Sequence, residues 1–254
     1  MNHSYPRHIH FESVPNFRDL GGYRTKDGRT VAWRRIFRSA ALHSITENDL
    51  YKLKNEIGPK TVIDLRNPKH DESEREVGLL KGIGTRRCHI PFRPDSSNYL
   101  KEEAELNPNA TNMGDLYFYR IKHQPFSQRL IDALELIAEP RNHPLIFHCS
   151  VGKDRTGVLA AITLAALDVV DEEIIQDYVL SAPAMPEIRS RIVNDPNTAP
   201  EVKALPDFQW EATAESMCLF LAALRREYGS VRGYLETNGA EASLIPRLQK
   251  ALLV

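Results

Sequence analysis

Short runs of apolar and β-branched residues recur along the chain and predict the strands of a buried sheet. The run TVIDL at 61–65 is the clearest of them. Other strands are predicted at 31–37, at 88–92 and at 145–147. The sequence therefore offers at least four strands, and they are separated by segments with a different periodicity.

Those intervening segments have helical periodicity, because their apolar residues recur at spacings of three and four. Thr46 and Asp49 resemble a capping pair that opens a helix through Glu56, which Gly58 then ends. The segment 155–167 is apolar nearly all round, so a central buried helix is predicted there. Further helices are predicted at 72–80, 114–122, 126–137 and 214–228, the last with Gly229 at its C-cap.

This order of elements predicts an α/β fold in a single domain, residues 1–254, with a helical C-terminal part. No internal repeat, low-complexity tract or Gly/Ser linker divides the sequence. Residues 94–112 turn polar and irregular, so an insertion is predicted at about 94–124.

Composition and charge exclude several classes of protein. The 254 residues include 34 acidic and 33 basic side chains, so there is no global positive charge to hold nucleic acid or an anionic membrane. The longest apolar stretch, 158–167, is too short to cross a bilayer. The N-terminus lacks the apolar core of a secretory signal, and three cysteines do not suggest a disulfide framework. A cytoplasmic protein is expected, with export without a cleaved signal left open.

The candidate chemistry lies in the segment HCSVGKDRTG at 148–157, which joins a predicted strand to the predicted central helix. A helix N-terminus offers unpaired N–H groups and a positive dipole end, and a loop folded over it forms an anion-binding nest. A thiol at Cys149 would feel that potential together with Arg155 and Lys153, so its pKa is expected to fall.

The five residues between Cys149 and Arg155 suit a loop that wraps a tetrahedral oxyanion. Arg155 can grip two oxygens with its guanidinium fork while the sulfur attacks phosphorus, and Thr156 can stabilise the departing sulfur. The predicted catalytic residues are Cys149, Asp154 and Arg155, and the predicted phosphate-binding residues are Ser150, Val151, Gly152, Lys153, Arg155 and Thr156.

The segment HCSVGKDRTG resembles the phosphate-binding loop of the cysteine-dependent protein tyrosine phosphatase superfamily. NFRDLGGY at 16–23, IFRS at 36–39 and VIDLR at 62–66 resemble the bacterial-type tyrosine and lipid phosphatases. EYGS and GYL, within 227–235, are similar to that group as well, so the resemblance runs from about residue 14 to the C-terminus. It implies a four- or five-stranded sheet flanked by helices, no metal or other cofactor, and a helical lid over the site.

Release of a phenolate or alkoxide needs a proton donor, and two aspartates are candidates. Asp154 lies inside the loop, and the resemblance assigns the general acid to this position. Asp95 lies 54 residues before Cys149, after the predicted strand at 88–92, where a mobile acid would also fit. We favour Asp154, although the cations beside it, Lys153 and Arg155, tend to lower its pKa.

Several neighbouring residues have two interpretations each. Arg66 either lines the site mouth or forms a structural ion pair, and Lys153 either favours multiply charged substrates or only fixes the loop. His148 is expected to hold the loop by hydrogen bonding, and Cys88 is a candidate to protect Cys149 through a reversible disulfide. Two further residues, Arg18 and Asp19, are expected to serve structure.

The leading hypothesis is a phosphatase that acts on phosphotyrosine through a phosphocysteine intermediate. A phosphoinositide or dual-specificity phosphatase is the main alternative, so the expected partner is a phosphorylated protein or a phosphoinositide. A phosphate-recognition module without turnover is a third hypothesis, which the presence of both Cys149 and Arg155 disfavours. A sulfur-transferring enzyme fits the Arg-Thr-Gly ending of the loop poorly.

Overall fold

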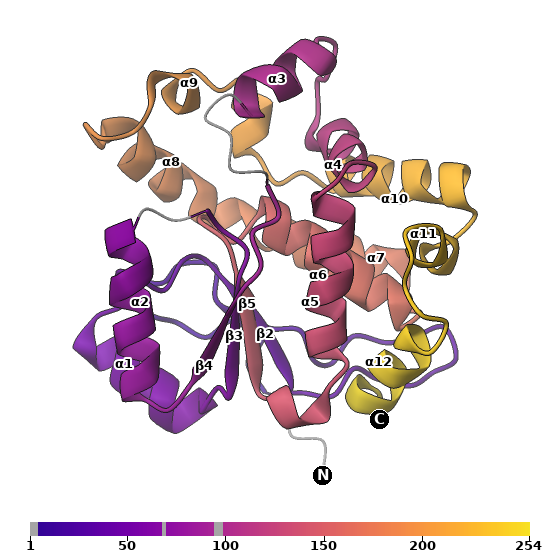
Figure 1. The fold of residues 1–254 in the computed structure, drawn as a ribbon, viewed down its shortest axis with the longest axis horizontal. Helices are drawn as coiled ribbons and strands as arrows, with labels where there is room; N and C mark the ends of the chain where they lie inside the picture. The colour runs from indigo at the N-terminus through magenta and orange to yellow at the C-terminus, as the bar shows by residue number, and fades with distance from the viewer. Residues whose placement is uncertain (1–4, 68–69, 94–98) are drawn as a thin grey trace.

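A computed structural model of the chain describes residues 5–67, 70–93 and 99–254. Its centre is a five-stranded sheet in the order β1-β2-β5-β3-β4 (Figure 1). β1 runs antiparallel to β2, and the other neighbouring pairs are parallel. The strands are β1 (Arg18–Asp19), β2 (Ile36–Ser39), β3 (Thr61–Asp64), β4 (Arg86–His89) and β5 (Leu145–His148). The predicted α/β fold is confirmed.

Two predicted strands are shifted along the chain. β2 starts at Ile36 rather than at residue 31, because Arg34 has φ 62 and interrupts the extended backbone. Val31 forms instead an isolated bridge to Leu253 near the C-terminus. β4 begins at Arg86, two residues before the predicted strand at 88–92. The sequence prediction relied on apolar residues, which mark the part of a strand that faces the core. The first residues of β4 are charged, so they gave no such signal.

The predicted helices are present. α1 (Glu47–Lys52) begins after Thr46, whose hydroxyl accepts a hydrogen bond from the Asp49 N–H, and it continues as a π-helical turn, η1 (Leu53–Ile57), before Gly58. The others that the sequence indicated are α2 (His70–Gly82), α4 (Met113–Ile121), α5 (Phe126–Ile137), α6 (Asp154–Ala166) and α10 (Ala214–Tyr228).

Part of the segment predicted as irregular is helical, since α3 (Tyr99–Leu106) lies inside residues 94–112. The C-terminal third contains further helices: α7 (Asp171–Val179), α8 (Met185–Asn194), α9 (Pro200–Lys203), α11 (Val231–Thr237) and α12 (Leu244–Leu252). Short 3-10 turns are η2 (Pro140–Asn142), η3 (Ala182–Ala184) and η4 (Asp207–Trp210). No helix of the described residues is long and apolar enough to cross a membrane.

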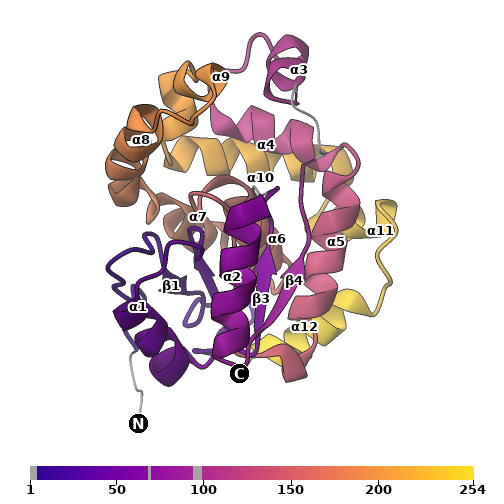
Figure 2. The same cartoon turned by 60° about the vertical axis from the view of Figure 1, so that its left-hand side comes forward.

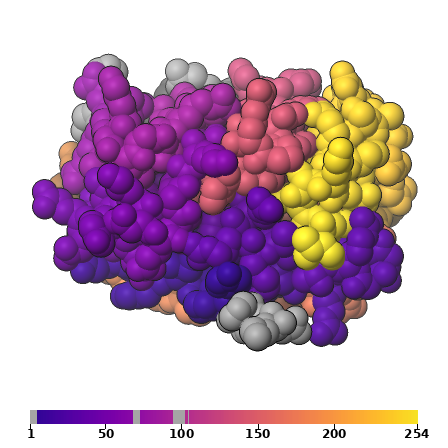
Figure 3. Space-filling model, turned by 90° about the horizontal axis from the view of Figure 1, so that it is seen from below, coloured from indigo at the N-terminus to yellow at the C-terminus, as the bar shows by residue number. Residues whose placement is uncertain are grey.

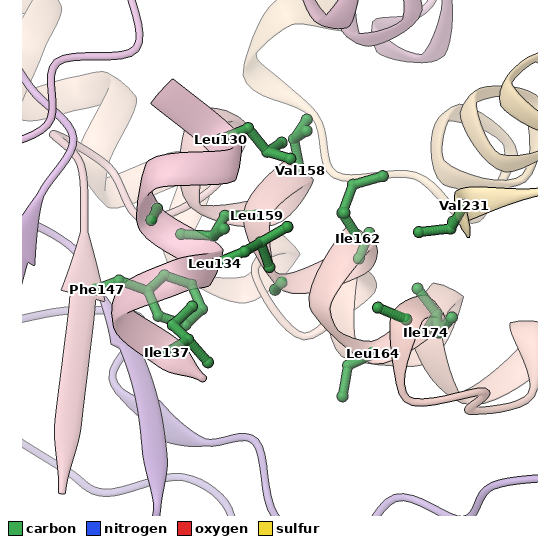
Figure 4. Packing of buried hydrophobic residues seen from close by; sticks show 14 of the residues in the cluster. Leu130, Leu134, Ile137, Phe147, Val158, Leu159, Ile162, Leu164, Ile174 and Val231 are labelled. Atoms are coloured by element: carbon green, nitrogen blue, oxygen red, sulfur yellow. The ribbon is translucent and has the colours of Figure 1, made fainter. Parts of the chain in front are cut away.

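Successive residues of the parallel strands point to opposite faces of the sheet, and each face has its own core. Val62 and Ile146 pack with Leu53 of η1 and Leu80 of α2. On the other face Phe147 packs with residues of α5 and α6, among them Leu134 and Leu159 (Figure 4). Figure 2 shows α2 and α5 on opposite sides of β3 and β4.

The two ends of the sheet differ. Beyond the carboxyl ends of the parallel strands the helices α3, α4, α8, α9 and α10 gather (Figure 1). At the opposite end the last residues of the chain lie against the segment before β2 (Figure 3). There Val254 exchanges two backbone hydrogen bonds with Thr30, and the Leu252 carbonyl accepts one from Ala32. The loop with the candidate chemistry lies at the helix-covered end.

Candidate active site

The sharp turn from β5 into α6 places Cys149 at the carboxyl end of the central strand, where ligands meet α/β sheets. Cys149 is buried, with 1% of its surface exposed. Gly152 allows the turn because its φ is 71, and a Cβ there would lie 2.6 Å from the Ser39 carbonyl oxygen. The loop 149–153 is thus folded tightly over the N-terminus of α6, as the motif predicts.

The Cys149 thiol is set up to ionise. Burial raises its pKa, but the Arg155 guanidinium and the polar groups of Thr156 outweigh this, so the pKa lies below its usual value. The N-terminus of α6 favours the anion as well. Because the thiolate is the reactive form of cysteine, Cys149 has the chemistry of a nucleophile.

Arg155 lies in the first turn of α6, and one nitrogen of its guanidinium has no partner among the described residues. Its Nη1 donates to the Leu65 carbonyl at 3.1 Å and its Nη2 to Ser150 Oγ at 3.2 Å. Its Nε is buried without a hydrogen-bond partner among the described residues. An unpaired buried donor on a cation is costly, and an oxyanion held in the loop would satisfy it.

Asp154 is the first residue of α6 and is held by two groups. Tyr117 on α4 donates its hydroxyl proton to Asp154 Oδ1 at 2.8 Å, and Lys153 Nζ lies 3.3 Å from the same oxygen. Burial raises the pKa of the carboxyl, but the Lys153 and Arg120 cations together with the Tyr117 hydroxyl bring it below its usual value. The alternative acid, Asp95, lies outside the described residues.

The Lys153 ammonium is fully buried and points to a carbonyl pair. Its Nζ donates to the Gln209 carbonyl at 2.6 Å and to the Glu211 carbonyl at 3.0 Å, at the end of η4. This position favours the interpretation in which Lys153 fixes the loop. The interpretation in which its charge receives extra substrate phosphates gains no support from these contacts.

A buried ionic cluster lies beside the loop, with members from β3, β4, β5 and α2. His148 Nε2 lies 3.2 Å from Glu76 Oε1, and its Nδ1 lies 3.4 Å from the Cys149 carbonyl oxygen. Burial lowers the pKa of His148, but the carboxylates of Glu76 and Asp64 outweigh this and raise it. Because both ring nitrogens lie beside acceptors, His148 holds the start of the loop by hydrogen bonding, as expected.

Arg66 belongs to the same cluster, where it forms the structural ion pair, and it also lines a groove beside the loop, so both interpretations of Arg66 find support. Its Nε donates to Asp64 Oδ1 at 2.9 Å and its Nη2 to Glu76 Oε2 at 2.7 Å. Arg87 contacts both carboxylates as well, at 2.6 and 3.2 Å. Asp64, Glu76 and His148 have a metal-like spacing. With two arginines on the two carboxylates, this donor set is that of an ion-pair network.

The proposed protection of Cys149 by Cys88 is wrong for this fold. Ile63 on β3 is the register partner of both Cys88 on β4 and Phe147 on β5, so Cys88 lies two strands away from Phe147. At about 4.8 Å per strand, this separation alone exceeds the roughly 7 Å that a disulfide allows between Cα atoms. Cys149 is two residues farther along, and the structure has all three cysteines free.

The back of the loop is held by residues to which the sequence assigned no role. Asn16 Nδ2 donates to the carbonyls of Val151 and Gly152, and Arg38 Nη2 donates to the Gly152 carbonyl. Asn16 and Arg38 occur in the stretches that carry the family resemblance. Asp177, which binds Arg38, gave no signal, because it reads as an ordinary polar position of the amphipathic helix α7.

Arg18 and Asp19 serve structure, as expected. Arg18 is buried and pairs with Asp177, its Nε lying 2.9 Å from Oδ1. The Asp19 carboxylate accepts hydrogen bonds from the backbone N–H groups of Gly21 and Arg34 at 2.7 and 2.8 Å. Burial outweighs these bonds and raises the pKa of Asp19 to about 6.

A groove of about 330 Å³ opens beside the loop. Ser150 and Val151 line it from the loop, Ala40 and Ala41 from the segment after β2, and Ile188 and Arg191 from α8. The loop is therefore accessible from this side to a group larger than a phosphate ion.

Comparison with known proteins matches this chain to one family. A model described as the tyrosine phosphatase family matches residues 9–254. The triple specificity protein phosphatase PtpB of Mycobacterium tuberculosis is 34% identical over 272 aligned positions, covering 94% of this chain and 96% of the relative. A tyrosine-protein phosphatase of Nostoc commune is 27% identical, over 85% of this chain and 73% of the relative. Among solved structures, the Siw14 catalytic core aligns with a TM-score of 0.43 and 16% identity, over 80% of this chain and 92% of that one.

Proposed function

Because this chain belongs to the tyrosine phosphatase family, we propose that it hydrolyses phosphotyrosine through a phosphocysteine formed on Cys149. One observation carries the assignment of residues. The buried Cys149 thiol has a lowered pKa at the N-terminus of α6, beside an arginine whose Nε lacks a partner among the described residues. Nucleophile, positive potential and a free donor for an oxyanion therefore meet in one loop.

In the first step Cys149 Sγ attacks phosphorus, and the S–P bond forms as the bond from phosphorus to the tyrosyl oxygen breaks. Arg155 and the loop N–H groups bind the equatorial oxygens, where charge develops. Asp154 in its protonated form gives its proton to the leaving oxygen. Its carboxyl lies in the first turn of the same helix as Arg155, so both act on one substrate phosphate.

In the second step a water molecule attacks the phosphocysteine. The S–P bond breaks, its electron pair returns to sulfur, and the proton of the water passes to Asp154. The thiolate and a protonated Asp154 are then restored for the next substrate. The groups that lower the pKa of Asp154, which include Lys153 and the Tyr117 hydroxyl, favour the carboxylate that accepts this proton. The chain's own residues supply nucleophile, charge and proton, so we expect full activity in the presence of EDTA.

A phosphoinositide is the second candidate substrate, and the name of the mycobacterial relative, a triple specificity phosphatase, motivates its inclusion. The groove beside the loop, with Arg191 on its wall, gives a larger headgroup room to approach. Phosphotyrosine remains the first choice because the matching family model and the Nostoc relative both bear that activity in their names.

The test is phosphate release from a phosphotyrosine peptide, a phosphoserine peptide and a short-chain phosphoinositide at matched concentrations. Wild type and Cys149→Ser are compared side by side, with Cys218→Ser as the matched control because Cys218 is an exposed thiol on α10. We expect turnover by wild type and the control only, fastest on phosphotyrosine. Equal activity of Cys149→Ser would refute the mechanism, and a faster phosphoinositide reaction would reverse the order of substrates. Binding without turnover by wild type would indicate a recognition module.

A further inference from the structure

The back of the catalytic loop is held by a buried network centred on Asp177. Asp177 Oδ2 accepts from Arg38 Nη1 at 2.6 Å, and its Oδ1 accepts from Arg18 Nε at 2.9 Å. The side chains of both arginines are fully buried, and that of Asp177 is 2% exposed. We propose that Arg38 is a positioning residue of the phosphatase reaction, which orients the loop N–H groups and supplies a buried positive charge to the Cys149 thiolate.

The orienting role follows from peptide geometry. Arg38 Nη2 donates to the Gly152 carbonyl at 2.7 Å, and Asn16 Nδ2 donates to the carbonyls of Val151 and Gly152 at 3.2 and 3.0 Å. The C=O and N–H of a trans peptide point in opposite directions. Two carbonyls held at the back therefore turn the N–H groups of Gly152 and Lys153 toward the opposite side, where the anion binds.

The electrostatic role follows from a count of charges. Two arginines share one aspartate, so the network carries one excess positive charge in a buried place. The other groups that bind Asp177 are neutral, because Tyr23 offers a hydroxyl at 3.0 Å. Asp177 itself is ionised, since burial raises its pKa but Arg18 and Arg38 hold it well below the usual range. An anion at Cys149 interacts favourably with Arg38, so the thiolate can offset this excess.

The positive charge of Arg38 and the negative charge of the Cys149 thiolate stabilise each other. Burial and Arg18 lower the pKa of Arg38 to about 10, while Asp177 and the Cys149 anion act in the opposite direction. Because the interaction between two charges is mutual, Arg38 in turn favours the thiolate form of Cys149. Other charged groups act on the sulfur as well: Arg155 on α6 lowers the pKa of Cys149, Asp154 on the same helix raises it, and the Lys153 ammonium in the loop interacts with the thiolate.

Two substitutions separate the two roles. Arg38→Gln removes the charge, while the Gly152 carbonyl keeps its hydrogen bond from Asn16 Nδ2. Asn16→Gly removes the neutral donor, keeps all charges and suits the positive φ of 62 at this position. Arg225→Gln is the matched control, because it breaks an arginine–aspartate pair with Asp171 that makes no contact with the loop.

The readout is the pH dependence of iodoacetamide alkylation of Cys149, in a background with Cys88→Ser and Cys218→Ser. The proposal rests on the proposed function, but alkylation reports the thiolate even if no phosphate ester is hydrolysed, so the two can fail separately. For Arg38→Gln we expect alkylation at neutral pH to slow about tenfold, with kcat/KM falling in parallel. For Asn16→Gly we expect an unchanged alkylation profile and a lower kcat, and for Arg225→Gln no change in either.

An alkylation profile of folded Arg38→Gln that matches wild type would overturn the electrostatic role. An unchanged kcat of Asn16→Gly would overturn the orienting role. If Arg38→Gln does not fold, Asp177→Asn is tested instead. This variant increases the excess positive charge, so the pH at which Cys149 becomes reactive should move down, opposite to the shift expected for Arg38→Gln. No shift in that variant, or a shift to higher pH, counts against the proposal.

Discussion

At the scale of single residues, the proton chemistry rests on how Asp154 is held. Tyr117 and Lys153 both stabilise its ionised form. Contacts from other parts of the chain hold both of these side chains in place. Tyr117 reaches it from α4, and the Lys153 ammonium is fixed by the carbonyls of Gln209 and Glu211. The acid–base residue is thus tuned by segments far away in the sequence.

Asp154→Asn tests the assignment of the acid. We expect a loss of about 100-fold or more in kcat on phenyl phosphate, whose leaving group needs a proton, and a smaller loss on 4-nitrophenyl phosphate. Steady-state kinetics on a series of aryl phosphates measures this. The corresponding Asp95→Asn variant is the control, and a leaving-group dependence that appears only in that variant would transfer the role to Asp95.

Tyr117→Phe tests the tuning of the same carboxyl. Loss of the hydroxyl removes a hydrogen bond to the carboxylate, so the pKa of Asp154 rises. The acid step needs the protonated form, and kcat/KM on phenyl phosphate should fall as pH rises through this pKa. The alkaline limb of the profile is therefore expected at higher pH than in wild type. A shift to lower pH would contradict the arrangement described.

The sequence allowed the reacting residues to be predicted better than the residues that support them. The spacing of Cys149 and Arg155 is a local signal, because both flank one short loop. Asp177 left no such signal, since a buried aspartate on an amphipathic helix reads as a solvated one. The contacts of the Lys153 side chain could not be predicted either, because its partner is a backbone carbonyl 56 residues farther along the chain.

At the scale of elements, some helix boundaries could be predicted from the sequence because a capping residue marks them. Thr46 caps α1 and Gly229, with φ 74, ends α10, both as the sequence indicates. The start of β2 was misplaced because the apolar Val31 pairs with the chain terminus, a long-range contact with no local trace. α3 was missed because its polar composition resembles that of a loop.

Gly152→Ala probes the turn between β5 and α6. A Cβ at this position would lie 2.6 Å from the Ser39 carbonyl at a φ of 71, so we expect a destabilisation of about 1–3 kcal/mol and a large loss of activity. Urea unfolding and turnover are measured together. Gly28→Ala is the control, because Gly28 has φ 88 with no atom within 4 Å, and its activity should stay at the wild-type level. Equal effects of the two variants would argue against the close approach at Ser39.

At the scale of the whole molecule, the catalytic loop and the last residues of the chain lie at opposite ends of the sheet. The helices gathered at the carboxyl ends of the strands surround the loop, whereas the chain terminus closes the other end (Figures 1 and 3). The Leu252 side chain is fully buried there, and its carbonyl accepts a hydrogen bond from Ala32 at 2.7 Å. Changes at the terminus should therefore act on folding and leave the loop geometry intact.

Removal of residues 252–254 tests this separation. The deletion eliminates the buried Leu252 and the backbone hydrogen bonds to residues 30–32, so we expect a loss of about 3–5 kcal/mol in the free energy of unfolding. The kcat of the protein that remains folded should be unchanged. Thermal unfolding and active-site titration with a thiol reagent measure the two quantities. Unchanged stability, or a reduced kcat per titrated site, would contradict the separation.

The sheet has one further consequence, for how copies of this chain meet each other. One border is β1, which is only two residues long, and His8 forms a bridge with Arg18 along it. The other border is β4, whose residues Arg86, Arg87 and His89 carry basic side chains. Short and charged edge strands resist the addition of foreign strands. Both borders of the sheet therefore resist growth by added strands from molecule to molecule.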